Sequence, residues 1–398
     1  MKTNMGVFFG GSSVEHEVAI ISAVQAMNYI DTDRFNVVPV YITKDGEMYT
    51  GELLTQMESF RDIPALIKKC TKVALVNKNG KCVLQGLDGG LFAKKTEIAI
   101  QIAFPIVHGT NCEDGSLQGL FETLRLPYIG CDVCSSAVGM DKAVFKNVIM
   151  AAGLPSLDCI TFRARKWFED KEEITERIKE NVGFPLIVKP ANLGSSVGIS
   201  KVKTEDDLDE AVELACSFAE KILVEKAITS LREINCSVLG DADECEASVC
   251  EEPFMNAEIL SYVDKYMSNS KSGGSKGMAS VSRKCPAEIS EEKAEEIRNI
   301  SKEVFKALGC SGVSRIDYLM DTEDNNKVYV NEINTIPGSL AFYLWEASGL
   351  KYKDMINKLA DIAYKRARTR NSTMFTIETN LLSTAGSFGA KGAKGAKR

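Results

Sequence analysis

The sequence is poor in histidine and has no long apolar run. Only His16 and His108 occur among its 398 residues. Cys131 and Cys134 form a close pair, but no second pair or histidine cluster completes a zinc site. No stretch approaches the roughly 18 apolar residues that a membrane span requires. These absences argue against a zinc domain and a membrane protein, and we expect twelve mostly buried thiols in a cytoplasmic protein.

An excess of positive over negative charge occurs only in the C-terminal segment. The chain has 48 Lys and Arg against 55 Asp and Glu, and the last 34 residues alone carry a net charge of +7. The rest of the chain therefore carries −14. Since phosphate-backbone binding needs a basic face, nucleic acid is not expected to be the main partner. The Gly-Ala-Lys repeats of the tail have no periodic apolar face, which predicts disorder.

Two common nucleotide-binding motifs are also missing. Gly10-Gly11 is not part of a G-x-G-x-x-G sequence, and no Lys-Ser/Thr pair follows the glycines of the 194–198 loop, so neither a dinucleotide fingerprint nor a P-loop is present. The small residues of this loop could still bring backbone N–H groups close to phosphates, with Lys189 upstream. A Gly-Ser turn between two strands would have the same sequence.

Apolar patterning predicts an α/β first unit. Residues 5–9 indicate a strand that leads through a tight loop into a helix with apolar residues 20, 21, 24 and 27 on one side. Further strands at 37–43 and 99–107 complete an open α/β sheet. Beyond it, strands are expected on both sides of the 194–198 loop, helices from Thr204 and around 291–308, and two strands beside a turn at 321–326.

The two strands around the 321–326 turn carry polar residues at every second position. Arg315 and Asp317 share one face, and so do Glu332 and Asn334, so a hairpin would bring them together. Two carboxylates and an amide oxygen suit Mg²⁺ or Mn²⁺. The alternative is a charged, solvated face. An EF-hand is rejected because Asn326 replaces the required glycine and because the flanks alternate like strands.

Glu15 follows Ser12 by three residues at the start of a predicted helix. On local grounds this pattern favours a capping box. In the same way, Lys142, Lys189 and Lys265 are individually typical of surface lysines.

A family resemblance gives these residues a different meaning. Across 1–365 the chain resembles the D-alanine–D-alanine ligases of the ATP-grasp superfamily, whose motifs it carries in the family's order. The matching segments are GGSSVEHEV (10–18), HGTNCEDGSLQG (108–119), MDK (140–142), VKPANLGSSVG (188–198), DKY (264–266), CP (285–286), RID (315–317) and EINTIPG (332–338).

The resemblance implies an ATP-grasp fold that combines α/β and α+β elements in three domains. We expect an N-terminal open α/β domain at 1–135 that binds the first D-amino acid and a central subdomain with the glycine-serine loop at 136–221. A C-terminal subdomain with the metal and oxyanion residues would follow at 222–365, and a disordered basic tail at 366–398.

The resemblance also implies roles for individual residues in a reaction that uses ATP to activate one D-alanine as an acyl phosphate, which the amine of a second D-alanine attacks. Two Mg²⁺ or Mn²⁺ ions would be held by Asp317, Glu332 and Asn334, and the oxyanion would face Arg315 and the Gly338 N–H. Glu15 would bind the first ammonium, linked through Ser195 to Tyr266. The nucleotide would contact Lys142, Lys189, Gly194, Ser195, Ser196, Glu225, Glu233 and Lys265, and His108 would lie near the first substrate.

The sequence departs from the family in two places. Cys112 stands where glycine is usual, so this position is expected to need an unusual backbone angle or a reshaped loop. After Gly338 the usual serine for the second carboxylate is missing, and Ser339 or Tyr343 could replace its hydroxyl.

At position 266 the chain has a tyrosine, as do the family members that form the dipeptide. This resemblance favours D-alanine as the acceptor. The alternatives are a D-serine or D-lactate acceptor, or a nucleotide-binding regulator that has lost ligation. The expected partners are D-alanine and ATP, without nucleic acid or membrane, and a homodimer is one option for the assembly.

Overall fold

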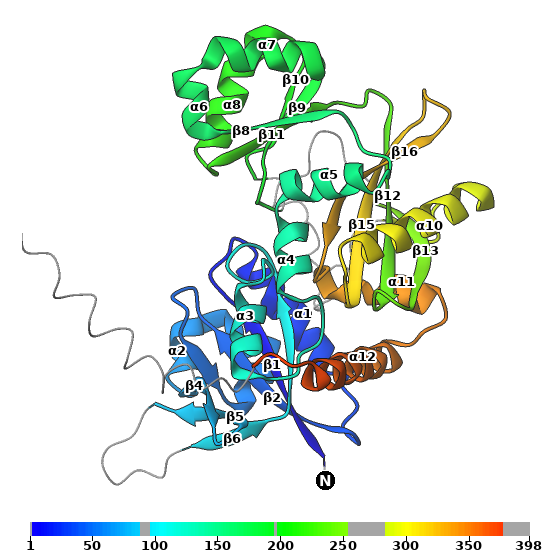
Figure 1. Cartoon of the computed structure of the whole chain (residues 1–398). Coiled ribbons are helices and arrows are strands. Elements are labelled where there is room, and N and C mark those ends of the chain that lie inside the picture. The colour runs from blue at the N-terminus through cyan, green and yellow to red at the C-terminus, as the bar shows by residue number, and fades with distance from the viewer. Residues whose placement is uncertain (1, 88–95, 195–196, 254–282, 377–398) are drawn as a thin grey trace, which may run out of the picture.

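The computed structural model describes residues 2–87, 96–194, 197–253 and 283–376. Within these ranges the chain forms three sheets that follow one another along the sequence (Figure 1). None of the helices in the described ranges is long and apolar enough to cross a membrane. All twelve cysteines carry free thiols, as expected from the absence of a disulfide pattern.

The first sheet has the strand order β6-β5-β4-β3-β2-β1-β7. Strands β2, β1 and β7, at one end of this order, are parallel, while the strands from β3 to β6 pair antiparallel. The expected strand at 99–107 is two strands, because β6 ends at Ile100 and pairs at the edge, whereas β7 starts at Ile102 and lies beside β1. The elements are β1 (Thr3–Gly10), α1 (His16–Met27), β2 (Phe35–Ile42), β3 (Met48–Thr50), η1 (Glu52–Thr55), η2 (Met57–Asp62), α2 (Ile63–Ile67), β4 (Thr71–Lys78), β5 (Lys81–Gly86), β6 (Glu97–Ile100), β7 (Ile102–Val107) and α3 (Ser116–Leu124).

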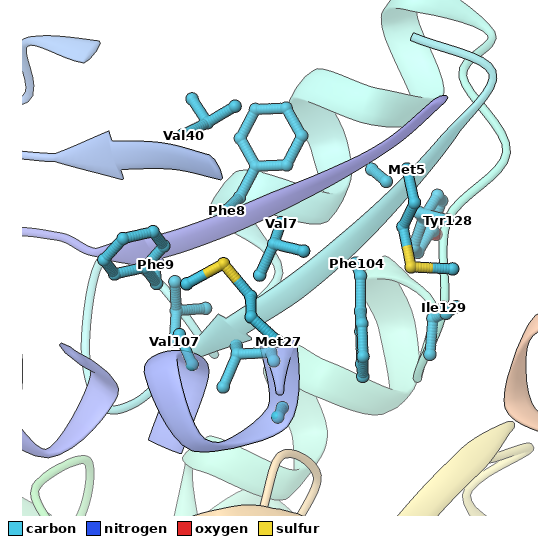
Figure 2. Packing of buried hydrophobic residues seen from close by; sticks show 14 of the residues in the cluster. Met5, Val7, Phe8, Phe9, Met27, Val40, Phe104, Val107, Tyr128 and Ile129 are labelled. Atoms are coloured by element: carbon cyan, nitrogen blue, oxygen red, sulfur yellow. The ribbon is translucent and has the colours of Figure 1, made fainter. Parts of the chain in front are cut away.

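Strand β1 is buried on both faces, as a central parallel strand should be. Figure 2 shows Phe8 beside Val40 on one face and Val7 facing Met27 of α1 on the other. This packing fixes the carboxyl end of β1, where the 10–15 loop begins. Ligand-binding loops of open α/β sheets lie at this edge.

The second sheet is smaller, with the order β10-β9-β11-β8 and antiparallel pairing throughout. The strand of this sheet that comes last along the chain, β11 (Lys221–Lys226), pairs with both β9 and β8. The expected domain boundary at 221 therefore cuts through this sheet and is too early. The other elements are β8 (Cys159–Arg163), α6 (Ala164–Glu169), α7 (Lys171–Asn181), β9 (Leu186–Pro190), β10 (Ser200–Val202), η3 (Glu205–Asp207) and α8 (Leu208–Cys216). The 194–198 loop joins β9 to β10, as expected.

The third sheet has the order β14-β13-β12-β15-β16 and packs on α10, which Ser290 caps at its first turn. Phe145 and Ile149 of α5 belong to the same buried cluster, so the apolar face of this helix packs with the third sheet. The elements are α4 (Val133–Met140), α5 (Lys142–Ala151), β12 (Leu231–Gly240), β13 (Cys245–Pro253), β14 (Arg283–Lys284), α10 (Glu291–Ala307), β15 (Gly312–Asp321), β16 (Lys327–Asn334), η5 (Gly338–Ala341) and α11 (Phe342–Ala347).

The C-terminal helix α12 (Tyr352–Ser372) returns to the first sheet, where Met355, Ile356 and Leu359 join the N-terminal core (Figure 1). The expected disordered tail from 366 is therefore wrong for its first part, since α12 continues to Ser372. Arg366 donates to the backbone oxygens of Gly130 and Tyr128 and anchors the helix end. Residues 377–398 lie outside the described ranges.

Candidate functional site

The β15–β16 hairpin forms as the alternation predicts, and its polar residues converge. Asp317 lies opposite Glu332 and Arg315 opposite Asn334 across the two strands. Arg315 binds Asp317 with two hydrogen bonds of 2.7 Å, from Nε and from one terminal nitrogen. Asn334 donates to the same carboxylate at 3.1 Å. The strands on both sides of the 321–326 turn also exclude an EF-hand.

These side chains are largely withdrawn from water. Burial raises the pKa of Asp317, and the nearby Glu332 adds to this effect while Arg315 opposes it. Against the effect of burial, the Asp317 charge raises the pKa of Arg315. A buried and strongly hydrogen-bonded group of this kind is not a solvated hairpin face.

The hairpin offers the oxygen donors that a hard divalent cation prefers. The described residues contain no cluster of three or more His, Cys, Asp and Glu side chains arranged for a metal. Asp317 and Glu332 face each other across the strands, and the Asn334 amide lies against the Asp317 carboxylate. Two carboxylates and an amide fit Mg²⁺ or Mn²⁺, which keep further ligands from water or phosphate.

Lys142 connects this hairpin to the glycine-serine loop. It is the first residue of α5, whose N-terminus is capped by Asp141. Its Nζ lies 3.1 Å from Glu332 Oε2 and donates to the Leu193 backbone oxygen at 2.8 Å. Although burial acts in the opposite direction, the Glu332 charge raises the pKa of Lys142. The expected phosphate-binding lysine, loop and hairpin therefore meet at one place.

Lys189 and Glu225 form the second charged group of the site. Lys189 Nζ lies 2.5 Å from Glu225 Oε1 and 3.2 Å from Asn331 Oδ1, next to Glu332 in β16. Burial, which outweighs the Glu225 charge, lowers the pKa of Lys189. A third charged partner was not predicted: Lys146, one helical turn after Lys142, lies 2.8 Å from Glu225 Oε2.

Glu233, the second expected nucleotide-binding acid, lies on β12 and pairs with Leu319 of β15. Its neighbour two positions on, Asn235, pairs with Asp317, so Glu233 and Asp317 point to the same face of the third sheet.

Glu15 reaches the glycine-serine loop from the first domain. It occupies the N-cap position of α1 itself, without a side-chain cap hydrogen bond, so the Ser12–Glu15 capping box is wrong. Instead, the Glu15 N–H donates to the Ser13 hydroxyl at 3.0 Å. Its carboxylate fills the space beside two glycines, because a Cβ on Gly109 or Gly194 would lie 2.9 Å from Glu15 Oε2.

His108 is a packed residue that supports the loop after β16. Its Nδ1 lies 2.9 Å from the Ile336 backbone oxygen, and its Nε2 lies 3.1 Å from the Ser22 hydroxyl. That hydroxyl in turn accepts the Ser339 N–H at 3.0 Å. Burial lowers the pKa of His108, which favours the neutral ring. With both ring nitrogens engaged, His108 orients the 336–339 segment.

Glu113 holds the same segment and was not identified from its sequence context. Its carboxylate accepts the Ile336 N–H at 2.8 Å, the Thr335 hydroxyl at 3.2 Å and the Gly109 N–H at 3.2 Å. Gly338, the expected oxyanion donor, follows two residues after Ile336 as the first residue of η5. Glu113 therefore joins the two loops that border the site.

The segment after Gly338, which lacks the usual serine, makes an unusual turn. Ser339, Leu340 and Ala341 all have positive φ values, of 50°, 55° and 51°. The Ser339 hydroxyl is buried and makes no hydrogen bond within the described part of the chain. Tyr343, the other candidate hydroxyl, donates to Glu251 at 2.9 Å.

Cys112 does not need an unusual backbone angle, contrary to expectation. The positive φ falls on the preceding residue, Asn111, at 63°. The Cys112 side chain is buried against Gly11, where an added Cβ would lie only 2.1 Å from the sulfur. Four further predicted site residues, Ser195, Ser196, Lys265 and Tyr266, lie outside the described residues, so their places in the site stay predictions.

Comparisons with known proteins give matches over most of the chain. The model for the D-ala D-ala ligase N-terminus matches residues 4–131, and that for the D-ala D-ala ligase C-terminus matches 148–361. A D-alanine–D-alanine ligase of Thermosipho melanesiensis is 40% identical over 95% of this chain and 98% of its own length. One of Acetivibrio thermocellus is 39% identical, with 92% and 96% covered.

Two solved structures extend the similarity to the fold. The D-alanine–D-alanine ligase from Coxiella burnetii matches with a TM-score of 0.76 and 30% identity, covering 97% of this chain and 99% of that one. The VanG D-Ala:D-Ser ligase from Enterococcus faecalis matches with a TM-score of 0.74 and 31% identity, covering 91% and 100%.

Proposed function

Because the chain belongs to the D-alanine–D-alanine ligase family, we propose that it is an ATP-dependent ligase that joins two D-alanines for peptidoglycan synthesis. The observation that carries the proposal is the meeting of three motifs from distant parts of the chain. Lys142 touches both Glu332 and the Leu193 backbone oxygen, while Glu15 lies against Gly194. A binding-only protein has little use for the buried Arg315 beside these groups.

Activation of the first D-alanine would use the charges around the glycine-serine loop. Lys142 and Lys189 would bind phosphate oxygens, and Glu15 would receive the ammonium of the amino acid. Mg²⁺ or Mn²⁺, held by Asp317, Glu332 and Asn334, would neutralise charge on the transferring phosphoryl group when bound.

Dipeptide formation would then depend on hydrogen-bond donors aimed at the reacting carbonyl. Attack by the second amine turns the carbonyl oxygen of the acyl phosphate into an oxyanion, which Arg315 and the Gly338 N–H would stabilise. Such preorganised donors supply about 3 kcal/mol each. Glu113 and His108 support this step indirectly, because both bind Ile336 just before Gly338.

The second substrate site departs from the family's sequence, because the usual serine after Gly338 is missing. Of the two hydroxyls expected to replace the family serine, Ser339 is the better candidate for the acceptor carboxylate. The Ser339 hydroxyl has no hydrogen bond among the described residues, whereas the Tyr343 hydroxyl donates one to Glu251. A buried hydroxyl without a partner is costly, so a ligand carboxylate would relieve it.

D-serine is the second candidate acceptor, because a D-Ala:D-Ser ligase is among the similar structures. The proposed partners are small molecules, with neither nucleic acid nor membrane, and light scattering would test for a homodimer. The decisive experiment offers D-alanine and ATP with D-alanine, D-serine, D-lactate or glycine as acceptor and identifies the products by mass. D-alanyl-D-alanine should dominate. If D-alanine fails to stimulate ADP formation at any Mg²⁺ concentration, the protein is instead a regulator that has lost ligation.

Tyr266→Phe provides a second test of the acceptor. Loss of the hydroxyl that we expect to bind Ser195 and link to Glu15 should weaken dipeptide formation and raise the relative rate with D-lactate. A wild-type preference for D-lactate would contradict this assignment while leaving the ATP half-reaction intact.

A further inference from the structure

Lys146 is a lysine in the interior of the molecule. Its side chain is 1% exposed, and its Nζ lies 2.8 Å from Glu225 Oε2, whose side chain is 2% exposed. It comes from the buried face of α5, together with Phe145 and Ile149. Lysine is almost never fully buried unless it is paired, so this position requires an explanation.

The pairing around Lys146 leaves a surplus positive charge. Glu225 is shared between Lys146 and Lys189, which bind its two oxygens at 2.8 and 2.5 Å. The remaining nearby lysine, Lys142, already has Glu332 as its partner at 3.1 Å. Two buried lysines, Lys146 and Lys189, therefore share the single buried carboxylate of Glu225, and an unmatched buried charge is expensive.

The contact with Glu225 is also incomplete as a structural bridge. Within the described residues, neither Lys146 Nζ nor Glu225 Oε2 has a hydrogen bond of good geometry, although the two atoms are close. Burial would raise the pKa of Glu225, but the charges of Lys189 and Lys146 outweigh it and lower the pKa to about 2. The carboxylate thus stays ionised between two cations.

We propose that Lys146 is a positioning residue of the nucleotide site, which holds Glu225 so that the carboxylate fixes Lys189 and leaves one excess positive charge for a nucleoside di- or triphosphate. The inference rests on the proposed use of ATP. Without Lys146, Glu225 and Lys189 would form a neutral pair, and the carboxylate could turn away from its present position. The surplus charge that now attracts phosphate would be lost.

Titration with ADP in the absence of D-alanine tests this role on the full-length protein. Lys146→Met should raise the Kd for ADP by about tenfold or more, the size of losing one charge-assisted interaction. The KM for ATP should rise in parallel, while the KM for D-alanine should change less than about twofold, because Glu15 and not Lys146 faces the amino acid. Lys146→Arg keeps the charge and should recover most of the ADP affinity.

Lys166→Met is the matched control, because Lys166 is an exposed lysine of α6 that pairs with Asp170. It should leave the Kd for ADP unchanged. A Lys146→Met protein that melts earlier but binds ADP like the wild type would reduce Lys146 to a stabilising residue and overturn the inference. If this variant does not fold, Lys146→Gln takes its place, with the same expected loss of affinity. A wild type that binds no ADP would instead refute the proposed function, and this inference with it.

Discussion

Glu113 makes the stability of the protein depend on pH in a direction opposite to that of most carboxylates. Burial raises the pKa of Glu113 from its ordinary value of 4.5 to about 7, with the Ile336 N–H opposing and the Glu15 charge adding to the effect. Between these values the folded protein keeps a proton that the unfolded chain has released. The free energy of unfolding should therefore fall as the pH rises through this window.

The size of the effect follows from the separation of the two pKa values. At about 1.4 kcal/mol for each pH unit, the loss approaches about 3 kcal/mol between pH 4.5 and pH 7.5. Glu113→Gln removes the titration but keeps the shape of the side chain. It should also lose the bond from the Gly109 N–H, at a pH-independent cost of about 1–3 kcal/mol.

Denaturant unfolding of the wild type and of Glu113→Gln at several pH values from 5.0 to 7.5 measures this contribution. The stability of the wild type relative to the variant should decrease by about 2–3 kcal/mol across the series. Glu58→Gln is the control, because the Glu58 side chain is 79% exposed. The difference in free energy of unfolding between this variant and wild type should not change with pH. If the free energies of unfolding of Glu113→Gln and wild type changed in parallel with pH, Glu113 would bind no proton on folding and the reasoning would be refuted.

Four further changes test other parts of the structure. Glu332→Gln should lower kcat by at least about a hundredfold, and near-normal turnover would contradict a metal-binding role for the hairpin. Arg366→Ala should cost about 2 kcal/mol in chemical unfolding through lost backbone bonds, whereas ending the chain after residue 376 should leave activity within about twofold. Gly11→Ala should destabilise the fold by at least about 2 kcal/mol, and adding Cys112→Gly should recover part of the loss by removing the sulfur contact.

Local patterns predicted the elements whose signal lies within a few residues. The alternation around Asp317 and Glu332 was enough to predict two strands with facing carboxylates, because a hairpin fixes its own register. The strand at 99–107 was not divided correctly, since its two halves have the same apolar character and differ only in which strand they pair with. Element type was thus predictable, while the choice of neighbour was not.

Residues that depend on distant partners were missed. Glu113 accepts hydrogen bonds from residues more than 200 positions away, so its own surroundings in the sequence could not distinguish it from a surface acid. Lys146 follows Lys142 by one helical turn, and this spacing on an otherwise apolar face was the one available signal. Only tertiary packing shows that both lysines point inward.

The return of α12 to the first sheet has a consequence for synthesis on the ribosome. Met355, Ile356 and Leu359 share a buried cluster with residues of β1 and α1, so the last described helix supplies part of the N-terminal core. This part of the N-terminal core therefore stays uncovered until α12 has been translated. At about 5–20 residues per second this leaves the nascent chain exposed for tens of seconds, an interval in which chaperone binding competes with aggregation.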